Sequence, residues 1–154
     1  MTNVAYFDTS ALLKKYVTEI GSDWVQAYLT SLPMPTVFTS SLTVVEAVCA
    51  FSRRLREGIL MRDAYTIIEK AFDYDAQHKY NLLDVNPTTL ETARQLAKSH
   101  PLRAYDAMHL ATAQLVNRQL TRIGKPPLTF VCADDRLLAV AQVEGLLIQN
   151  PNQS

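Results

Sequence analysis

Short apolar runs alternate along this chain with longer segments in which apolar and polar residues follow a helical spacing. Five runs are short, rich in β-branched or aromatic residues, and expected to be strands: residues 4–7, 36–39, 82–85, 128–132 and 146–148. Strands that alternate with helices are typical of a parallel sheet whose two faces are both covered. We therefore predict an α/β fold, a three-layer α/β/α sandwich with a central parallel sheet.

The helical segments show apolar positions three or four residues apart. In the strongest one, Val44, Val48, Phe51 and Leu55 share a stripe, and the helix is expected to run from Thr43 to near Gly58. Other helices are expected at residues 11–16, at 24–29 after a cap at Ser22 or Asp23, at 61–78, after Asn86-Pro87, at 106–116 and at 137–143. The segment 106–116 is apolar almost all round, which indicates a helix buried against the sheet.

Composition places the chain among ordinary single-domain proteins. It has 154 residues, 48% of them hydrophobic, and we expect one domain over residues 1–150 followed by a short tail at 151–154. Lys+Arg and Asp+Glu are both 15, so the net charge is zero and no long-range attraction to nucleic acid or anionic membranes is expected. Any contact with nucleic acid must then be local.

Cysteine use and hydropathy point to a cytoplasmic protein. Cys49 and Cys132 lie in apolar surroundings, and we expect two buried thiols in a reducing compartment. The start of the chain lacks the basic region of a signal peptide. The longest uncharged run, residues 24–45, contains Pro33 and Pro35 and many hydroxyl groups, so no membrane span is expected.

Four acids fall where strands give way to helices. Asp8 follows the first strand, Glu46 lies early in the helix after the second, Asp106 opens the apolar helix, and Asp134 follows the strand at 128–132. The carboxyl ends of parallel strands share one edge of the sheet, so these side chains are expected to meet there. Each also has a structural interpretation: Asp8, Asp106 and Asp134 as helix caps or first-turn acids, and Glu46 as the partner of Thr43 in a capping box.

A group of carboxylates at one edge would repel unless a cation lay among them. Carboxylate oxygens favour a hard ion, Mg²⁺ or Mn²⁺, over zinc. Such an ion lowers the pKa of a bound water and holds phosphate oxygens. The four acids together therefore predict a metal-dependent site that acts on a phosphate ester.

Four segments of the chain resemble the PIN domain family of small metal-dependent ribonucleases, which includes the VapC-like toxins of type II toxin–antitoxin pairs. They are Tyr6-Phe7-Asp8-Thr9-Ser10-Ala11-Leu12, Ser41-Leu42-Thr43-Val44-Val45-Glu46-Ala47, Tyr105-Asp106-Ala107-Met108-His109-Leu110-Ala111-Thr112-Ala113 and Phe130-Val131-Cys132-Ala133-Asp134-Asp135-Arg136-Leu137. They occur in the family's order and span most of the chain. The third is the most specific. The resemblance implies a PIN-like form of the sandwich.

The resemblance also implies roles for these residues. Asp8, Glu46, Asp106 and Asp134 would be catalytic, with Asp8 and Asp106 as the main metal ligands, Asp134 as a further one, and Ser10 supporting the site by hydrogen bonding. The expected cofactor is Mg²⁺ or Mn²⁺, the activity is endoribonuclease cleavage of RNA, and the expected partners are an antitoxin protein and a second copy of the chain in a homodimer.

Two features near the fourth acid depart from a simple match. The family usually has Thr or Ser two residues before that acid, and this chain has Cys132, whose thiol is a poorer hydrogen-bonding group than a hydroxyl. Asp135 stands beside Asp134, and the spacing favours Asp134 as the inward-facing acid.

Other side chains have weaker claims to a role. Basic residues that could grip RNA are Lys14, Lys15, Arg53, Arg54, Arg56, Arg62 and Arg103, although most of them are expected to be part of solvated helix faces. His109 lies three residues after Asp106 on the same side of the helix and is expected to be a packed, neutral histidine. Trp24, Tyr28 and Tyr65 are expected to serve core or dimer packing rather than base stacking.

Three alternatives stay open. Asp8 after a first strand also occurs in haloacid dehalogenase-like phosphatases, which need a second Asp where this chain has Ser10, and in receiver domains, which need an acidic pair upstream. The fold could serve as a catalytically weak binding module. It could also be a PIN-fold RNA-processing nuclease without an antitoxin.

Overall fold

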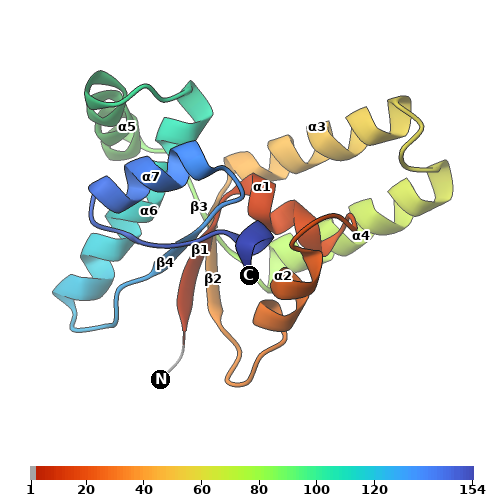
Figure 1. Ribbon diagram of the computed structural model, residues 1–154, viewed down its shortest axis with the longest axis horizontal. Helices are drawn as coiled ribbons and strands as arrows, with labels where there is room; N and C mark the ends of the chain where they lie inside the picture. The colour runs from red at the N-terminus through yellow and green to blue at the C-terminus, as the bar shows by residue number, and fades with distance from the viewer. Residues whose placement is uncertain (1–2) are drawn as a thin grey trace.

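Five parallel strands form the centre of the protein, which is described for residues 3–154 by a computed structural model. The strands are β1 Val4–Phe7, β2 Thr36–Ser40, β3 Asn81–Leu83, β4 Thr129–Val131 and β5 Leu147–Gln149. Their order across the sheet is β3-β2-β1-β4-β5, and every neighbouring pair is parallel. The first strand therefore lies in the middle, and the residue that follows it lies at the centre of one edge (Figure 1).

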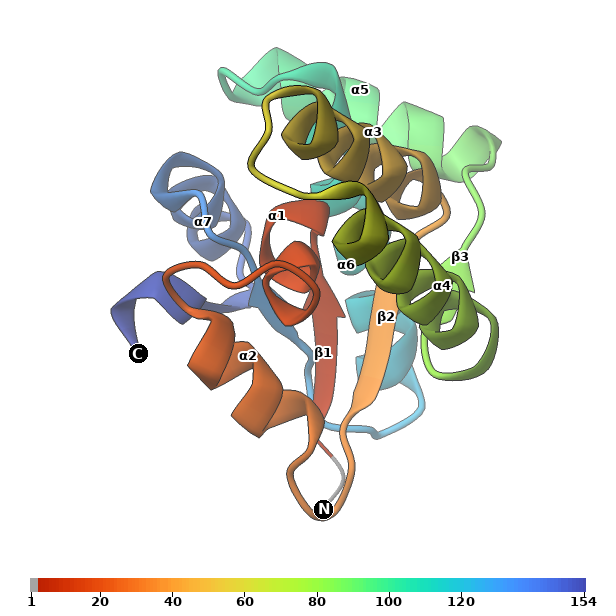
Figure 2. The same ribbon diagram turned by 90° about the vertical axis from the view of Figure 1, so that its right-hand side faces the viewer.

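Helices cover both faces of this sheet. They are α1 Thr9–Leu12 continued by the 3-10 turn η1 Leu13–Lys15, α2 Ser22–Leu29, α3 Leu42–Arg56, α4 Arg62–His78, α5 Pro87–Ser99, α6 Ala104–Arg122, α7 Asp135–Val143 and the 3-10 turn η2 Pro151–Gln153. Helices α1 to α4 contribute to one apolar core and α5 to α7 to another. Figures 1 and 2 show the two groups on opposite sides of the sheet, with α3 and α4 running side by side beyond it.

The alternation of side chains along β1 divides these two cores. Ala5 and Phe7 face the core under α1 to α4, whereas Tyr6 faces the core under α6 and α7. Successive side chains of a strand point to opposite faces, so a continuous apolar run is what a strand covered on both faces requires. The predicted three-layer α/β/α sandwich with a parallel sheet is confirmed.

Two local predictions are wrong. Ser22 does not cap α2, because Gly21 takes the cap position with a φ of +89°, and Ser22 instead accepts a hydrogen bond from the amide of Glu19. A side chain at Gly21 would also lie 2.8 Å from Asn152, so the turn η2 packs directly against this glycine. Cys49 is exposed rather than buried, because α3 turns Ala47 and Phe51 to the core and Cys49 away from it.

The boundaries of helix α6 also differ from those predicted. Helix α6 begins two residues earlier and ends six residues later than predicted, since only its middle is apolar all round and its polar last turns are still helical. No helix within residues 3–154 is both long and apolar enough to cross a membrane.

Candidate active site

The carboxyl ends of β1 and β4 place two of the four acids at one edge of the sheet. Asp8 follows β1 and caps α1 by accepting a hydrogen bond from the amide of Ala11 at 3.0 Å. Asp134 follows β4 and caps α7 by accepting one from the amide of Arg136 at 2.9 Å. Asp8 and Asp134 therefore both cap helices and lie at the edge of the sheet, because helices that leave a parallel sheet begin at this edge.

Asp8 has a buried carboxylate, and the hydrogen bonds that it accepts within the described part of the chain come from neutral groups. Asp8 is only 6% exposed. The hydroxyl of Ser10 donates a hydrogen bond to its carboxylate at 2.8 Å, which is the kind of contact that the predicted supporting role of Ser10 requires. The thiol of Cys132 donates a second bond to it at 3.1 Å. Among residues 3–154, no lysine or arginine forms an ion pair with Asp8.

Burial therefore governs the titration of Asp8. Loss of water raises the pKa of this carboxyl group above its usual value, and the charge of His109 and the hydrogen bonds from Ala11, Ser10 and Cys132 offset only part of the rise. Burial also raises the pKa of the Cys132 thiol, which keeps it protonated and able to donate. The same sulfur accepts the amide of Asp134 at 3.3 Å, so it links the ends of β1 and β4.

Glu46 does not form the capping box that its spacing from Thr43 suggested. Thr43 is already inside α3, and its hydroxyl is bonded to those of Thr39 and Thr9. Glu46 instead accepts a hydrogen bond from Thr9 at 2.9 Å and lies 2.6 Å from Nε2 of His109. Thr9, the residue next to Asp8, thus connects Glu46 to the edge of the sheet at which Asp8 lies.

His109 lies in a buried polar chain from the sheet to Glu46. Its Nδ1 is 2.7 Å from the hydroxyl of Tyr6, whose pKa burial and the charge of Asp8 raise far above the ordinary value. Tyr6 therefore keeps its hydroxyl hydrogen and pairs with Nδ1 of His109, while Nε2 of the same ring faces Glu46. Burial raises the pKa of Glu46, but the hydrogen bond and charge of His109, with the bond from Thr9, lower it overall.

This network extends the predicted site by two residues. His109 was expected as a packed histidine, and it is packed, at 3% exposure, yet its contacts are polar and reach a candidate catalytic acid. Its position one turn after Asp106 was the sequence signal for it. Tyr6 carried no such signal, because a tyrosine in an apolar strand looks like any core residue.

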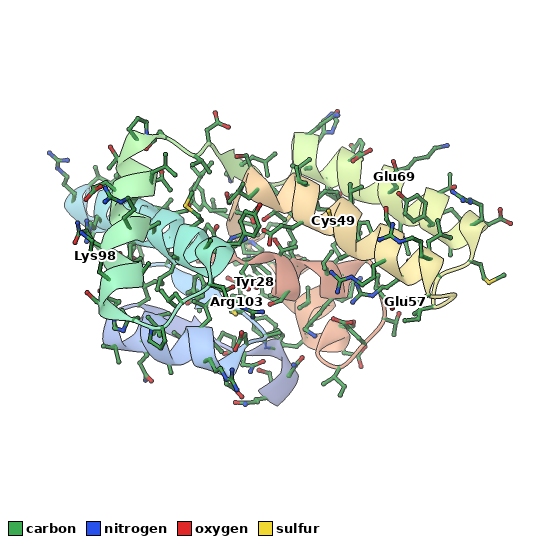
Figure 3. All side chains as sticks on the ribbon, turned by 90° about the horizontal axis from the view of Figure 1, so that it is seen from above. Tyr28, Cys49, Glu57, Glu69, Lys98 and Arg103 are labelled. Atoms are coloured by element: carbon green, nitrogen blue, oxygen red, sulfur yellow. The ribbon has the colours of Figure 1, made fainter. Side chains whose placement is uncertain are left out.

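Arg103 joins the remaining two acids. Its Nε lies 3.3 Å from Oδ2 of Asp106, and its Nη2 lies 3.6 Å from Oδ2 of Asp134. Its side chain is 81% exposed, and Figure 3, which looks onto this edge of the sheet, shows Arg103 near the middle of the view. Asp135 faces elsewhere, because Asn150 and Gln153 donate hydrogen bonds to it.

The other basic candidates with ion-pair partners lie away from these acids. Lys14 and Arg54 both pair with Glu19, and Lys15 pairs with Asp75. Within residues 3–154, Arg103 is the arginine or lysine that forms ion pairs with members of the four-acid set. The aromatic candidates are packing residues: Trp24 stacks on Tyr28 with ring centroids 5.1 Å apart, and both contact the core under α1 to α4.

The donor chemistry of the site fits a hard divalent cation. Asp8, Asp106 and Asp134 offer carboxylate oxygens, which Mg²⁺ and Mn²⁺ prefer, and within residues 3–154 no lysine or arginine pairs with the buried Asp8. The side chains do not form a complete set of metal ligands, since residues 3–154 contain no group of three Asp, Glu, His or Cys side chains placed to hold an ion. Arg103 takes the place between Asp106 and Asp134 where positive charge is needed.

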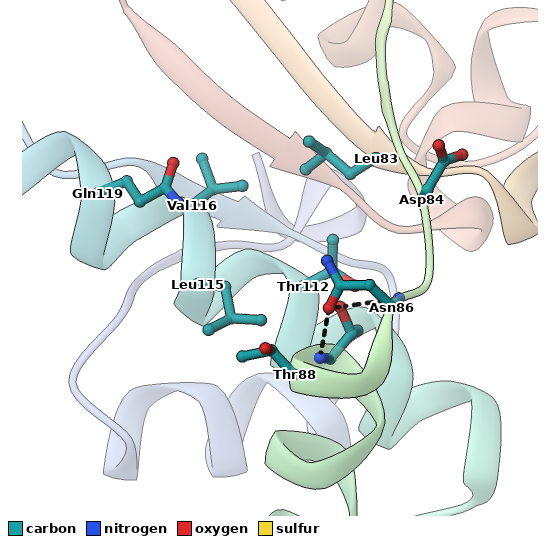
Figure 4. A pocket seen from close by; sticks show the side chains of 9 residues that line it. Leu83, Asp84, Asn86, Thr88, Thr112, Leu115, Val116 and Gln119 are labelled. Atoms are coloured by element: carbon teal, nitrogen blue, oxygen red, sulfur yellow. Dashed lines mark hydrogen bonds between the residues drawn. The ribbon is translucent and has the colours of Figure 1, made fainter.

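Two cavities are lined partly by residues of α6 or of the segment just before it. One, of about 680 Å³, is lined by Asp106 and Asp134 together with Arg103 and Arg136. The other, of about 310 Å³, lies between the end of β3, the start of α5 and the middle of α6 (Figure 4). Polar side chains of this second cavity bond to neighbouring residues, as in the hydrogen bond that Asn86 accepts from the amide of Thr89. The first cavity is the one of the two that Asp106 and Asp134 line.

The sequence and the fold of this chain are similar to those of known proteins. The sequence model of the PIN domain matches residues 5–143. Ribonuclease VapC35 of Mycobacterium tuberculosis is 31% identical over 153 residues, which cover 97% of this chain and 98% of that protein. Among solved structures, a toxin–antitoxin complex from Klebsiella pneumoniae matches with a TM-score of 0.63 at 20% identity over 96% of this chain and 97% of that one. FitAcB from Neisseria gonorrhoeae matches with a TM-score of 0.67 at 19% identity, with the same two coverages.

Proposed function

The chain belongs to the PIN domain family, and from this we propose that it is a Mg²⁺- or Mn²⁺-dependent endoribonuclease that acts as the toxin of a toxin–antitoxin pair. The relatives that match almost its whole length are named ribonucleases. A solved chain of the same fold comes from a toxin–antitoxin complex. RNA is therefore the proposed substrate, and a small antitoxin protein the proposed partner.

The observation that carries this proposal is the environment of Asp8. A carboxylate that is almost fully buried costs several kcal/mol unless a positive group compensates it, roughly the penalty of any unpaired buried ion. The chain supplies neutral donors to Asp8 and places three more acids along the same edge. This arrangement makes little sense for stability alone and suits the binding of a cation.

We assign the roles as follows. Asp8, Asp106 and Asp134 would hold the ion, and Ser10 and Cys132 fix the orientation of Asp8 through their hydrogen bonds. A bound Mg²⁺ or Mn²⁺ supplies an acidified water and neutralises negative charge on a phosphodiester. Glu46, whose pKa His109 and Thr9 lower, would accept a proton at this edge.

The test pairs two neighbouring acids that the fold turns in different directions. In a cleavage assay on a panel of structured RNAs, Asp134→Asn is expected to lower the rate about 100-fold or more, the usual size of a lost acid–base or charge contribution. Asp135→Asn is the matched control, because Asp135 contacts Asn150 and Gln153 instead. Asp106→Asn should behave as Asp134→Asn does.

Chelation should abolish cleavage, and added Mg²⁺ or Mn²⁺ should restore it. Equal rates for wild type and Asp106→Asn would refute the site assignment. Chelator-resistant cleavage would refute the metal dependence alone.

The toxin role and a housekeeping RNase role differ in the cell. Expression of a toxin without its antitoxin should arrest growth, and Asp106→Asn should relieve the arrest. Growth unaffected by an active enzyme would favour an RNA-processing nuclease. The proposed homodimer is tested separately by sedimentation of the purified chain.

A further inference from the structure

The cavity beside Asp106 and Asp134 has two kinds of wall. Leu102 and Val140 form an apolar side, and Leu137 is almost completely buried beneath them. Arg103 and Arg136 are exposed arginines on the polar side. Its volume of about 680 Å³ falls within the range of roughly 300–1,000 Å³ that small-molecule sites occupy.

A nucleotide has the same two-sided character as this cavity. Its base offers a flat face for apolar contact, and its phosphate pairs with arginine. Single-stranded RNA is the form that can place a base here, because a base inside a duplex is stacked on both sides. We propose that the cavity is a subsite for one unpaired nucleotide of the RNA, with the base against Leu102 and Val140 and the phosphate on Arg103 and Arg136.

The subsite rests on the proposed function, since it lies directly beside two of the acids assigned to cleavage. The attraction of the cavity for a phosphate depends on whether its acids are neutralised. Two arginines and two aspartates line the cavity, so its net charge is zero and Arg103 is held by the acids. Neutralising the acids leaves both arginines free for phosphate, so RNA binding should strengthen when a divalent cation binds or when an acid is removed.

The experiment measures binding without cleavage. A fluorescent single-stranded oligoribonucleotide of mixed sequence is titrated with Asp106→Asn protein in EDTA, and anisotropy gives the affinity. Asp106→Asn should bind more tightly than wild type under these conditions, because one acid is gone and Arg103 is released from it. Adding Arg136→Gln should weaken binding about 10-fold and reduce the slope of log affinity against log salt by about 0.7, as expected for one lost phosphate contact.

Matched variants test the apolar wall. Val140→Asp in the same background should weaken binding about 10-fold, since it adds an unfavourable charge and removes an apolar contact, a combined effect of about 1.4 kcal/mol. Val143→Asp adds the same charge to the same helix at a residue that does not line the cavity and is 76% exposed, and it should leave affinity unchanged. Arg118→Gln, at an exposed residue in the second half of α6, is the control for Arg136→Gln.

Failure of the subsite is distinct from failure of the proposed function. If Arg136→Gln and Val140→Asp bind RNA as their parent does, or the parent binds none, the subsite is wrong, even if wild type cleaves RNA with Mg²⁺. If wild type cleaves no RNA with any divalent ion while the two variants lose affinity as stated, the subsite stands and the nuclease assignment falls. Arg136 is a surface residue, so its variant remains informative if Val140→Asp unfolds.

Discussion

Two buried aspartates in this protein have contact partners of opposite kinds, charged in one case and neutral in the other. Asp75, in α4, is 4% exposed and is contacted by Lys15 at 2.6 Å, Lys79 at 3.0 Å and the hydroxyl of Tyr16 at 2.7 Å. Asp8, at the end of β1, is 6% exposed and has only neutral donors. Similar burial thus accompanies two lysine partners in one region and none in the other.

The pKa values of the two groups shift in opposite directions as a result. Burial raises the pKa of Asp75, but hydrogen bonds from Lys15, Tyr16 and Lys79 and the charge of Lys15 lower it overall. Burial raises the pKa of Asp8, and its neutral partners and the charge of His109 do not reverse the rise. Asp75 therefore holds η1 to α4, whereas no lysine or arginine among residues 3–154 pairs with Asp8. A residue kept at a cost to stability points to function.

The largest expected effect follows from removing the charge of Asp75. Asp75→Asn should lower the free energy of unfolding by about 3 kcal/mol at pH 7, because Lys15 and Lys79 lose their partner. A carboxyl group with a lowered folded pKa stabilises the protein above its unfolded pKa, and this contribution is lost as the pH falls through the folded value. Urea unfolding at pH 7 and pH 3 measures it, and the difference from wild type should shrink at pH 3.

Asp73→Asn is the control for this prediction, since Asp73 is exposed on the same helix. A loss as large for Asp73→Asn as for Asp75→Asn would contradict the special role of the Asp75 cluster.

The next effect is stabilisation by metal. Mn²⁺ at 100 times its dissociation constant should raise the free energy of unfolding by about 2.7 kcal/mol through mass action. Asp75→Asn should keep this gain, because Asp75 is not among the proposed ligands, and Asp8→Asn should lose it. Thermal melting with and without the ion decides the matter. An equal gain in all three proteins would place the ion elsewhere.

Asp8→Asn should itself stabilise the metal-free protein, by about 1 kcal/mol at pH 7, while abolishing cleavage. An acid with a raised folded pKa costs stability above that pKa, and the cost disappears as the pH falls and the group takes up a proton. The gain measured by urea unfolding in EDTA should therefore fade at acid pH. Loss of stability at pH 7 would mean that the charge of Asp8 is already compensated.

The smallest effect concerns Cys132, where the family usually has Thr or Ser. In Cys132→Ser a hydroxyl replaces the thiol that donates to Asp8, and a hydroxyl is the stronger donor. Stability should change by less than about 1 kcal/mol, the size of one hydrogen bond, while Mn²⁺ affinity rises a few-fold. Calorimetric titration measures the affinity. A weaker affinity would show that the geometry of the sulfur matters more than its donor strength.

The periodicity of the chain was sufficient for the fold and for the edge at which the acids lie. Apolar runs such as residues 4–7 and helical stripes such as that of Phe51 are local properties, and parallel strands bring their carboxyl ends to one edge wherever they occur in the sequence. The prediction that Asp8 and Asp134 follow strands there needed nothing further, whereas the supporting hydrogen bond of Ser10 was implied by the family resemblance. The assignment of the four acids to metal binding and catalysis stays a prediction.

Which side chains meet across the sequence was decided by the tertiary structure alone. Glu46 had an equally good local partner in Thr43, and only packing brought His109, 63 residues away, within 2.6 Å of it. Lys15 and Asp75 are 60 residues apart and belong to no motif. An ion pair depends on the distance between two atoms in space, and no spacing along the chain encodes that distance until the helices are packed.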